Sequence, residues 1–323
     1  MIDKNYKIVV FGGGSGLSNL LRGLKKYPLD VTAVVTVGDD GGSSGKLRDL
    51  FNMLPPGDIR RVLLSLSSNE DLFNDLFSYR FPSDIDGLGG HTVGNIILAA
   101  LSGMNDNNMS KAIEQLATIL NVKHQVLPVA KTPIIIEATF EDGTSAVGES
   151  SIVTMNKKIA SVRPYGSFEV NEKVIEAINA ADIIVYSQGS LYTSLIPNLF
   201  FDEVKEALKK SKAPKVYVAN VMTQDGETNG YKLSDHVKAL ADVISTEQID
   251  VVLANDCMDI DCDILKRYNE ENSYLVEADI ENVKSMNIIV QRSKFIYIED
   301  SYIRHNQNKL AAYIFKILID MME

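Results

Sequence analysis

Short apolar segments alternate with longer amphipathic segments along most of this chain of 323 residues. The short segments are rich in β-branched residues and contain few polar positions, which is typical of strands buried on both faces of a parallel sheet. The longer segments repeat apolar residues every three or four positions, and this spacing predicts helices. Strands and helices in alternation predict an α/β fold, with a mostly parallel sheet and helices on both of its faces.

The predicted strands are 7–11, 31–37, 182–187, 215–221, 250–254 and 287–290. The predicted helices are 17–26, 59–66, 92–101, 109–120, 172–180, 202–210, 234–244 and 308–322. The last helix is strongly apolar, and core packing suits it better than a membrane surface or an oligomer contact, because its polar face is not basic.

One block departs from this alternation. Residues 126–165 alternate polar and apolar positions with a period of two, and they carry turn signals at Asp142-Gly143 and Asn156-Lys157. This pattern predicts an antiparallel β meander inserted into the main fold. No linker or repeat divides the chain, so we expect a single domain over residues 1–323.

A run of small residues follows the first predicted strand and precedes the first predicted helix. It consists of Gly12, Gly13, Gly14, Ser15 and Gly16. A glycine loop between a strand and a helix directs the free N–H groups of the helix N-terminus at an anion. The dinucleotide fingerprint G-x-G-x-x-G is broken, because no glycine occupies its third position in either reading. The run therefore predicts phosphate binding rather than NAD chemistry, with a simple tight turn as the alternative.

Two adjacent carboxylates follow the second predicted strand. Asp39 and Asp40 precede a run of small residues that includes Ser43 and Ser44, and two cations come next. Small residues let the backbone approach a ligand closely. Paired aspartates beside such a cradle need a cation, a ribose hydroxyl or a base donor as partner. The combination predicts a nucleotide-like ligand, and a solvated turn is the alternative.

Two further loops carry candidate polar residues. Asp58 follows two prolines and fits a helix N-cap, or else it faces the ligand together with Arg60. His91 and Asn95 lie at the start of an otherwise apolar helix, where His91 is positioned to contact a phosphate or to act as an acid. A capping or packing role is the alternative for this histidine.

Small and polar residues also follow the third and fourth predicted strands. They include Gly189, Ser190 and Leu191 in one loop and Thr223 and Gln224 in the other. The carboxyl ends of parallel strands meet at one edge of a sheet, where ligands bind. We therefore expect these loops to converge with the two earlier ones on a single ligand site.

Composition and missing motifs exclude several classes of function. The net charge of −11, without a polybasic block, disfavours a nucleic-acid or anionic-membrane surface. Cys257 and Cys262, the only cysteines, lack the partners of a zinc site and are expected to be reduced in a cytoplasmic protein. The N-terminus leads directly into a strand, so no signal peptide is expected. Every apolar run is shorter than the roughly 18 residues of a transmembrane span.

Covalent and zinc-dependent catalysis are not expected. The sequence contains no G-x-S-x-G motif and no Walker lysine, and its histidines show no metal spacing. No residue is therefore assigned a catalytic role from the sequence.

Ordered motifs along nearly the whole chain resemble those of the YvcK-type gluconeogenesis factors, which are relatives of the CofD 2-phospho-lactate transferases. These motifs are residues 12–17, 36–48, 56–60, 90–95 and 188–194. The resemblance implies a Rossmann-like fold in a cytoplasmic bacterial protein that binds a UDP-sugar such as UDP-N-acetylglucosamine. It also implies a role in cell shape and cell-wall synthesis during growth on gluconeogenic carbon sources.

The resemblance extends the expected site to the C-terminal part of the chain. There it implies ligand contacts from Tyr268 and Arg304. Arg304 would suit a diphosphate through its fork of donors, and Tyr268 could stack on a base or a sugar.

Two functions agree with these features. In the first, the chain is a sensor that binds a UDP-sugar and, when occupied, engages a protein partner. Its candidate base-reading residues are Asn220, Thr223 and Gln224.

In the second function, the chain is a transferase in which Asp39 and Asp40 hold Mg²⁺ against a diphosphate. A transferase would need a positioned general base beyond the metal pair, and the only candidates, His91 and Asp58, do not make a strong case. We therefore favour the sensor. Homo-oligomerisation remains open in both.

Overall fold

The main sheet of the computed structural model, which describes residues 5–256 and 259–321, contains seven parallel strands. Their order is β10-β9-β8-β7-β1-β2-β3. The bounds are β1 (Tyr6–Gly12), β2 (Leu29–Val35), β3 (Gln125–Pro128), β7 (Ile183–Tyr186), β8 (Lys215–Val218), β9 (Val251–Asn255) and β10 (Ile289–Ser293). The predicted α/β class is confirmed.

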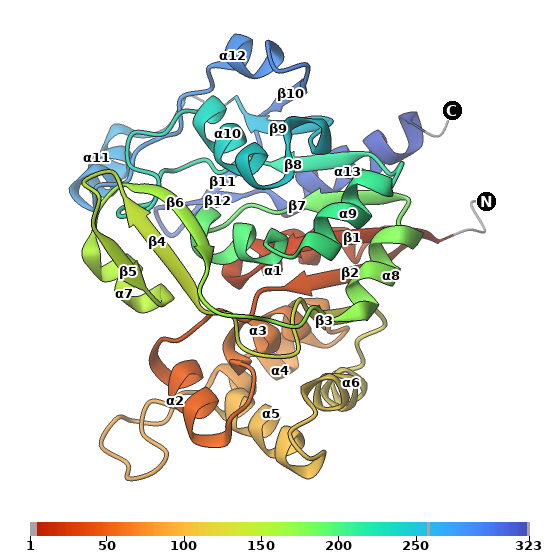
Figure 1. The fold of residues 1–323 in the computed structure, drawn as a ribbon, viewed down its shortest axis with the longest axis vertical. Coiled ribbons are helices and arrows are strands. Elements are labelled where there is room, and N and C mark those ends of the chain that lie inside the picture. Colours follow the sequence, from red (N-terminus) through yellow and green to blue (C-terminus); the bar gives the residue numbers. More distant parts are fainter. Residues whose placement is uncertain (1–4, 257–258, 322–323) are drawn as a thin grey trace.

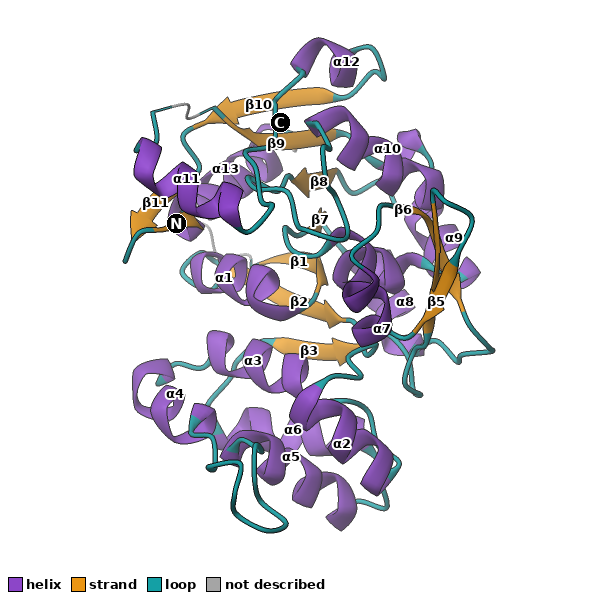
Figure 2. Cartoon of the chain, turned by 90° about the vertical axis from the view of Figure 1, so that its left-hand side faces the viewer, coloured by secondary structure: helices purple, strands orange, loops and turns teal. Residues whose placement is uncertain are grey.

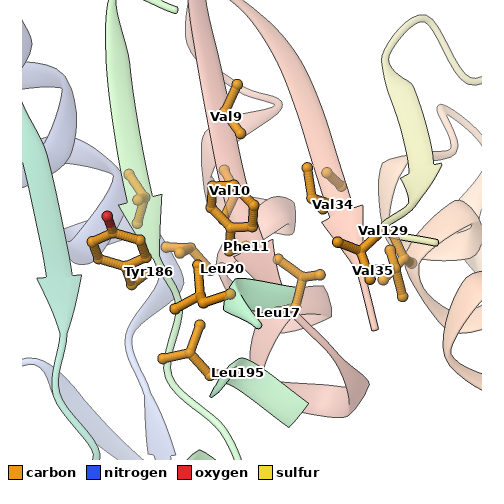
Figure 3. Close-up of a cluster of buried hydrophobic side chains, with 14 of the residues drawn as sticks. Val9, Val10, Phe11, Leu17, Leu20, Val34, Val35, Val129, Tyr186 and Leu195 are labelled. Atoms are coloured by element: carbon orange, nitrogen blue, oxygen red, sulfur yellow. The ribbon is translucent and has the colours of Figure 1, made fainter. Parts of the chain in front are cut away.

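The core forms where the apolar strands meet their helices. Val9, Val10 and Phe11 of β1 are at most 1% exposed, because helices cover both faces of this central strand. Leu17 and Leu20 lie on one face of α1 (Gly14–Leu24) and pack onto the sheet (Figure 3). The uninterrupted apolar pattern of the strands thus reflects burial on two sides.

Helices form the outer layers. α1 and α13 (Gln307–Asp320) pack against each other on one face, where the carbonyl oxygen of Gln307 closely approaches Gly23. α8 (Glu172–Ala180), α9 (Asp202–Lys210) and α10 (Leu233–Ile244) lie on the other face (Figure 2). Leu310, Ile314 and Leu318 of α13 are buried, which confirms core packing for the apolar C-terminal helix.

A group of helices between β2 and β3 forms a lobe beyond the β3 edge of the sheet (Figure 1). Its members are α2 (Gly42–Phe51), α3 (Pro56–Leu66), α4 (Glu70–Ser78), α5 (Val93–Met104) and α6 (Met109–Ile119). The sequence pattern predicted α3, α5 and α6. It predicted neither α4 nor α2, which begins inside the glycine- and serine-rich run.

The inserted antiparallel sheet is smaller than predicted. It contains β4 (Ile136–Phe140), β5 (Ser145–Val147) and β6 (Ile159–Pro164), in the order β5-β4-β6. The helix α7 (Glu149–Met155) connects β5 to β6. The predicted bounds of 126–165 were wrong at their start, because residues 125–128 pair with β2 as a main-sheet strand.

The remaining elements complete the carboxyl edge of the sheet and the C-terminal half. A π-helical turn, Leu191–Leu195, and a 3-10 turn, Ile196–Leu199, follow β7. α11 (Cys262–Glu270) and α12 (Ile280–Lys284) lie between β9 and β10. β11 (Ile296–Glu299) and β12 (Tyr302–His305) form a hairpin that leads into α13.

Cys262 is a free, exposed thiol, whereas Cys257 lies outside the described residues. Within the described part of the chain, no helix combines the length and the apolar character that crossing a membrane requires.

Candidate functional site

A cleft opens where the strand order of the main sheet reverses. Successive strands run from β1 towards β3 in one direction and from β7 towards β10 in the other, so the reversal lies between β1 and β7. Open α/β sheets bind ligands at such a switch point, beyond the carboxyl ends of the strands. Here the cleft has a volume of 550 Å³. Its walls come from Ser15, Gly16, Gln188, Gly189, Ser190, Asn220, Val221, Met222, Thr223, Gln224, Asp225, Tyr268, Glu271, Ser273, Ile303, Arg304 and His305.

A second cavity, of 500 Å³, adjoins the cleft. It lies between α1 and the β11–β12 hairpin and shares Ser15, Gly16, Gln188 and Arg304 with the cleft. Arg22 and Gln307 line its other side. The two cavities therefore form one elongated space, with Arg304 in the wall that they share.

The N-terminus of α1 is partly occupied by the chain's own carboxylate. The backbone N–H of Gly14 donates to Oδ2 of Asp58 at 2.7 Å. The prediction that Asp58 caps its own helix is wrong, since Pro55 is the N-cap of α3 and Asp58 lies inside the first turn. Burial raises the pKa of Asp58, while the nearby Arg61 opposes the rise. The N–H groups of the next residues, Ser15 and Gly16, lie at the cleft and have no partner within the first turn of the helix.

Gly16 is needed for close packing. A Cβ atom at this position would lie 2.1 Å from the carbonyl oxygen of Gln188, so only glycine allows α1 to approach the loop after β7. Gln188 is 3% exposed, and its Nε2 donates to the carbonyl oxygen of Gly16 at 3.1 Å. These contacts hold the two loops of the switch point together.

The loop after β7 is fixed by the loop after β8. Gly189 N–H donates to Oδ1 of Asn220 at 2.9 Å, and Nδ2 of Asn220 donates to Gly189 O at 2.7 Å. Ser190 Oγ donates to Oε1 of Gln224 at 2.8 Å. The fully buried Glu227 accepts from the backbone N–H of Tyr192 at 3.2 Å, and burial raises the pKa of Glu227 to about 6. A second internal carboxylate thus occupies a helix N-terminus at this edge.

The polar residues predicted to read a base are engaged inside the protein. Thr223 is 4% exposed, and its Oγ1 accepts from Tyr274 N–H at 2.8 Å. Gln224 bonds Ser190 and Glu227, and Asn220 bonds Gly189. These side chains shape the wall of the cleft, and each already uses part of its hydrogen-bonding capacity within the protein.

Arg304 supplies the positive charge of the cleft. Its side chain is exposed and stacks over the Tyr302 ring at 5.0 Å, and no carboxylate pairs with it in the described residues. The neighbouring His305 contacts Ala219 O through Nε2 at 3.2 Å, and burial lowers the pKa of His305 to about 4. His305 is therefore neutral near pH 7. Tyr268 lines the cleft, but its OH accepts from Ile303 N–H at 2.9 Å, which ties it to the hairpin.

His91, Ser43 and Asn95 form a separate polar group at the lobe. Ser43 Oγ lies 3.0 Å from His91 Nδ1, and Asn95 Nδ2 donates to the same oxygen at 3.0 Å. His91 also lines an open cavity of 410 Å³ together with Lys46. Burial lowers the pKa of His91, and the cations Lys46 and Arg80 add to this effect. Ser44 is 5% exposed, and its Oγ lies close to Gly57.

Carboxylates gather between this group and α1. Asp39 Oδ1 accepts from Gly41 N–H at 3.0 Å, and Asp40 Oδ1 accepts from Ser150 N–H at 2.8 Å. Glu149 lies beside them, and its pKa is raised to about 8 by burial and by the negative charges of Asp39, Asp58, Asp40 and Glu227. Each aspartate keeps an oxygen for a further partner, yet the described residues contain no group of three or more side chains already arranged to hold a metal ion.

Some candidate residues lie away from the cleft. Leu191 is 1% exposed and packs in the core. Gly12 packs against Ser187, and Gly13 lies against Thr36 and Asp58. Arg60 does not face the ligand cleft, because it is 7% exposed and donates to Phe77 O and Thr92 Oγ1. Its role is to join α3 to α4 and α5.

Two residues of the site were missed by the sequence analysis. Arg22 lies on the outward face of α1 at the second cavity and pairs with Glu70 at 2.6 Å. Arg22 follows Ser15 by two helical turns and so lies on the same face of α1, and this spacing could have indicated it. Glu149 reaches the aspartates only through the placement of the inserted sheet, and no local signal marks it.

Comparisons with known proteins agree with this architecture. A family model described as "2-phospho-L-lactate transferase CofD" matches residues 8–296. The gluconeogenesis factor of Bacillus subtilis is 43% identical over 98% of this chain and 98% of its own length. That of Halalkalibacterium halodurans is 42% identical over 96% of each chain. A crystal structure of a Bacillus halodurans protein superimposes with a TM-score of 0.93 at 42% identity, covering 97% of this chain and all of the other. This chain therefore belongs to the CofD family.

Proposed function

We propose that this chain is a regulatory protein that binds a nucleotide sugar, a UDP-sugar such as UDP-N-acetylglucosamine, at the carboxyl edge of its main sheet. It acts in gluconeogenic growth, in the control of cell shape and cell-wall synthesis, and its occupied form engages a protein partner. The name gluconeogenesis factor, which the relatives from Bacillus subtilis and Halalkalibacterium halodurans carry, supports the metabolic part of this role.

The joined cavities at the switch point are the main support for a nucleotide-sugar ligand. They measure 550 and 500 Å³ and meet at Arg304 and the N-terminus of α1. A nucleotide sugar is likewise elongated and carries its negative charge in the middle. A guanidinium fork and free helix N–H groups bind a diphosphate there, and the polar walls on either side receive hydroxyl groups.

The chemistry of the cleft walls favours binding over turnover. Ser190 donates its hydroxyl hydrogen to Gln224, and neutral His305 contacts a backbone carbonyl. Among the described residues, no hydroxyl that lines the cleft is hydrogen-bonded to an imidazole or a carboxylate that could activate it. The arrangement thus holds a ligand without a positioned nucleophile and base.

A transferase is the second candidate, and the carboxylate cluster favours it. Glu149 has its pKa raised to about 8 by burial and by its acidic neighbours, and a bound cation would offset their negative charge. Carboxylate oxygens are the ligands that Mg²⁺ prefers. Asp39 and Asp40 would hold the ion beside a diphosphate, where it would neutralise charge in the transition state.

Calorimetric titration with UDP-N-acetylglucosamine, with and without Mg²⁺, separates the two functions. For the regulatory protein we expect saturable binding without Mg²⁺ and recovery of intact ligand. Mg²⁺-dependent binding with release of UDP or UMP would instead establish the transferase. Binding of NAD in place of the UDP-sugar would refute both.

A further inference from the structure

A third cavity adjoins the cleft on the side of β8, β9 and β10. It has a volume of 330 Å³ and shares Asn220 and Val221 with the cleft. The three cavities therefore follow one another in a row, with Asn220 and Val221 at one junction and Arg304 at the other. The row continues the elongated space beyond the part assigned to the diphosphate.

The lining of the third cavity is mainly apolar, unlike that of the cleft. Ala219, Val221 and Ala254 line it from the ends of β8 and β9 and are at most 6% exposed. Leu275 and Ala278 close it from the segment before α12. Leu233 and Val276 add to the apolar lining, and Asn255 and Glu277 are among the few polar residues in it. A mostly apolar space of roughly 300 Å³ or more with a few polar groups is typical of small-molecule sites.

The mouth of this cavity carries paired polar groups. Arg292 is bonded to Asp256, and both side chains are about half exposed, at 50% and 42%. Guanidinium retains further N–H donors beyond that bond, and the carboxylate retains acceptor sites. Donors and acceptors side by side match the edge of a base such as uracil, in which carbonyl groups flank a ring N–H.

The cleft itself offers a poorer place for a base. Its candidate base-reading residues, Asn220, Thr223 and Gln224, already bond other parts of the protein. A base placed there would compete with those internal hydrogen bonds, and a buried polar group that loses its partner is destabilising. The apolar cavity involves no such competition.

We propose that the cavity lined by Ala219, Ala254, Leu275 and Ala278 is the nucleobase subsite of the ligand. This inference rests on the proposed function. The base enters between the apolar walls, with its polar edge at Asp256 and Arg292. The ribose then lies in the cleft and the diphosphate at Arg304, and the sugar extends into the cavity beside Arg22.

The absence of tryptophan from the sequence allows a direct test. In Leu275→Trp the new indole is the only tryptophan and lies in the wall of the proposed subsite. We expect a saturable change of its fluorescence with UDP-N-acetylglucosamine and with UDP, and none with N-acetylglucosamine 1-phosphate, which has no base. Ala177→Trp is the matched control, because Ala177 lines a cavity at the opposite, amino edge of the sheet. Its fluorescence should not respond to any of the three compounds.

A cavity-filling variant provides a second measurement. Ala278→Phe should weaken binding of UDP-N-acetylglucosamine and UDP at least tenfold by calorimetry. Thermal unfolding followed by circular dichroism establishes that the variant is folded. Should Leu275→Trp fail to fold, this variant decides alone.

The outcomes separate the subsite from the proposed function. If the unmodified protein does not bind UDP-N-acetylglucosamine, the proposed function is wrong and the subsite with it. If Leu275→Trp binds by calorimetry with silent fluorescence, or Ala278→Phe binds like the unmodified protein, the subsite is wrong and the function stands.

Discussion

The carboxylate of Asp58 accepts the backbone N–H of Gly14 at 2.7 Å and so places a negative charge at the start of α1. This helix N-terminus is the one that the glycine run predicts as an anion site. An internal carboxylate there removes one donor from the ligand and leaves those of Ser15 and Gly16. It also sets the position of α1 relative to α3, on which the cleft depends.

Replacing Asp58 separates its hydrogen bond from its charge. Asp58→Ala leaves the Gly14 N–H without an acceptor, so we expect a loss of about 1–3 kcal/mol in the free energy of unfolding. Asp58→Asn keeps an acceptor oxygen and removes a charge that burial and Asp39 already disfavour. It should cost clearly less in urea denaturation at pH 7. Equal losses in the two variants would show that the charge, and not the hydrogen bond, stabilises the site.

Glu149 should make stability depend on pH. Its pKa rises from an ordinary value of 4.5 to about 8 on folding, so the folded state binds the proton more tightly. The stabilisation is complete below about pH 4.5 and is lost as the pH rises towards 8. Relative to the unmodified protein, Glu149→Gln should therefore gain about 1–3 kcal/mol between those limits, after allowance for solvent screening.

Urea denaturation at several pH values tests the effect of Glu149. Glu203→Gln, a change of the same kind at an exposed position on α9, is the control and should show no such trend. A constant difference between Glu149→Gln and the unmodified protein over this range would contradict the assignment of the raised pKa.

Arg304 should dominate the affinity for a diphosphate. Arg304→Ala removes charge-assisted hydrogen bonds worth about 1.5–3 kcal/mol, so we expect binding of UDP-N-acetylglucosamine to weaken roughly 10- to 100-fold. Arg304→Lys keeps the charge but loses the planar fork, so its affinity should lie between that of the unmodified protein and that of Arg304→Ala. Arg163→Ala, on the exposed β6, is the control in the same calorimetric titration. Unchanged affinity in Arg304→Ala would place the diphosphate elsewhere.

Two glycines in helices should respond to alanine in opposite ways. Gly16→Ala forces a Cβ to within 2.1 Å of Gln188 O, a backbone atom, and overpacking of this kind costs about 1–3 kcal/mol. Gly103 in α5 has open space around its Cα, so Gly103→Ala should stabilise the helix by up to about 1 kcal/mol. Chemical denaturation measures both. A neutral Gly16→Ala would mean that the two loops move apart at little cost.

The main sheet could be predicted because its strands are apolar along their whole length. β1 and β7 are buried on both faces, and this environment leaves a direct trace in the sequence. α2 was missed because Gly42, Ser43, Ser44 and Gly45 form its first turns, and glycine and serine have low helix propensity. The placement of β3 was missed because its neighbour in the sheet, β2, is distant along the chain.

The location of the cleft could be predicted, but its internal bonding could not. Loops after parallel strands meet at one edge, so polar residues in those loops indicate the site. The partners inside it are far apart in sequence. Gly14 and Asp58 are separated by 44 positions, and Asp40 and Ser150 by 110. Only the packing of the lobe and of the inserted sheet brings them together.

Helix α7 sets the spacing between two loops of the carboxyl edge. The N–H of its second residue, Ser150, donates to Asp40, and its C-cap residue, Asn156, lies against Gly226 in the loop after β8. With seven residues it is about 10 Å long. None of these residues lines the cleft, yet lengthening or shortening α7 would move the Asp40 loop relative to the loop after β8, which forms one wall of the cleft. The inserted segment therefore determines how far the paired aspartates lie from the ligand cleft.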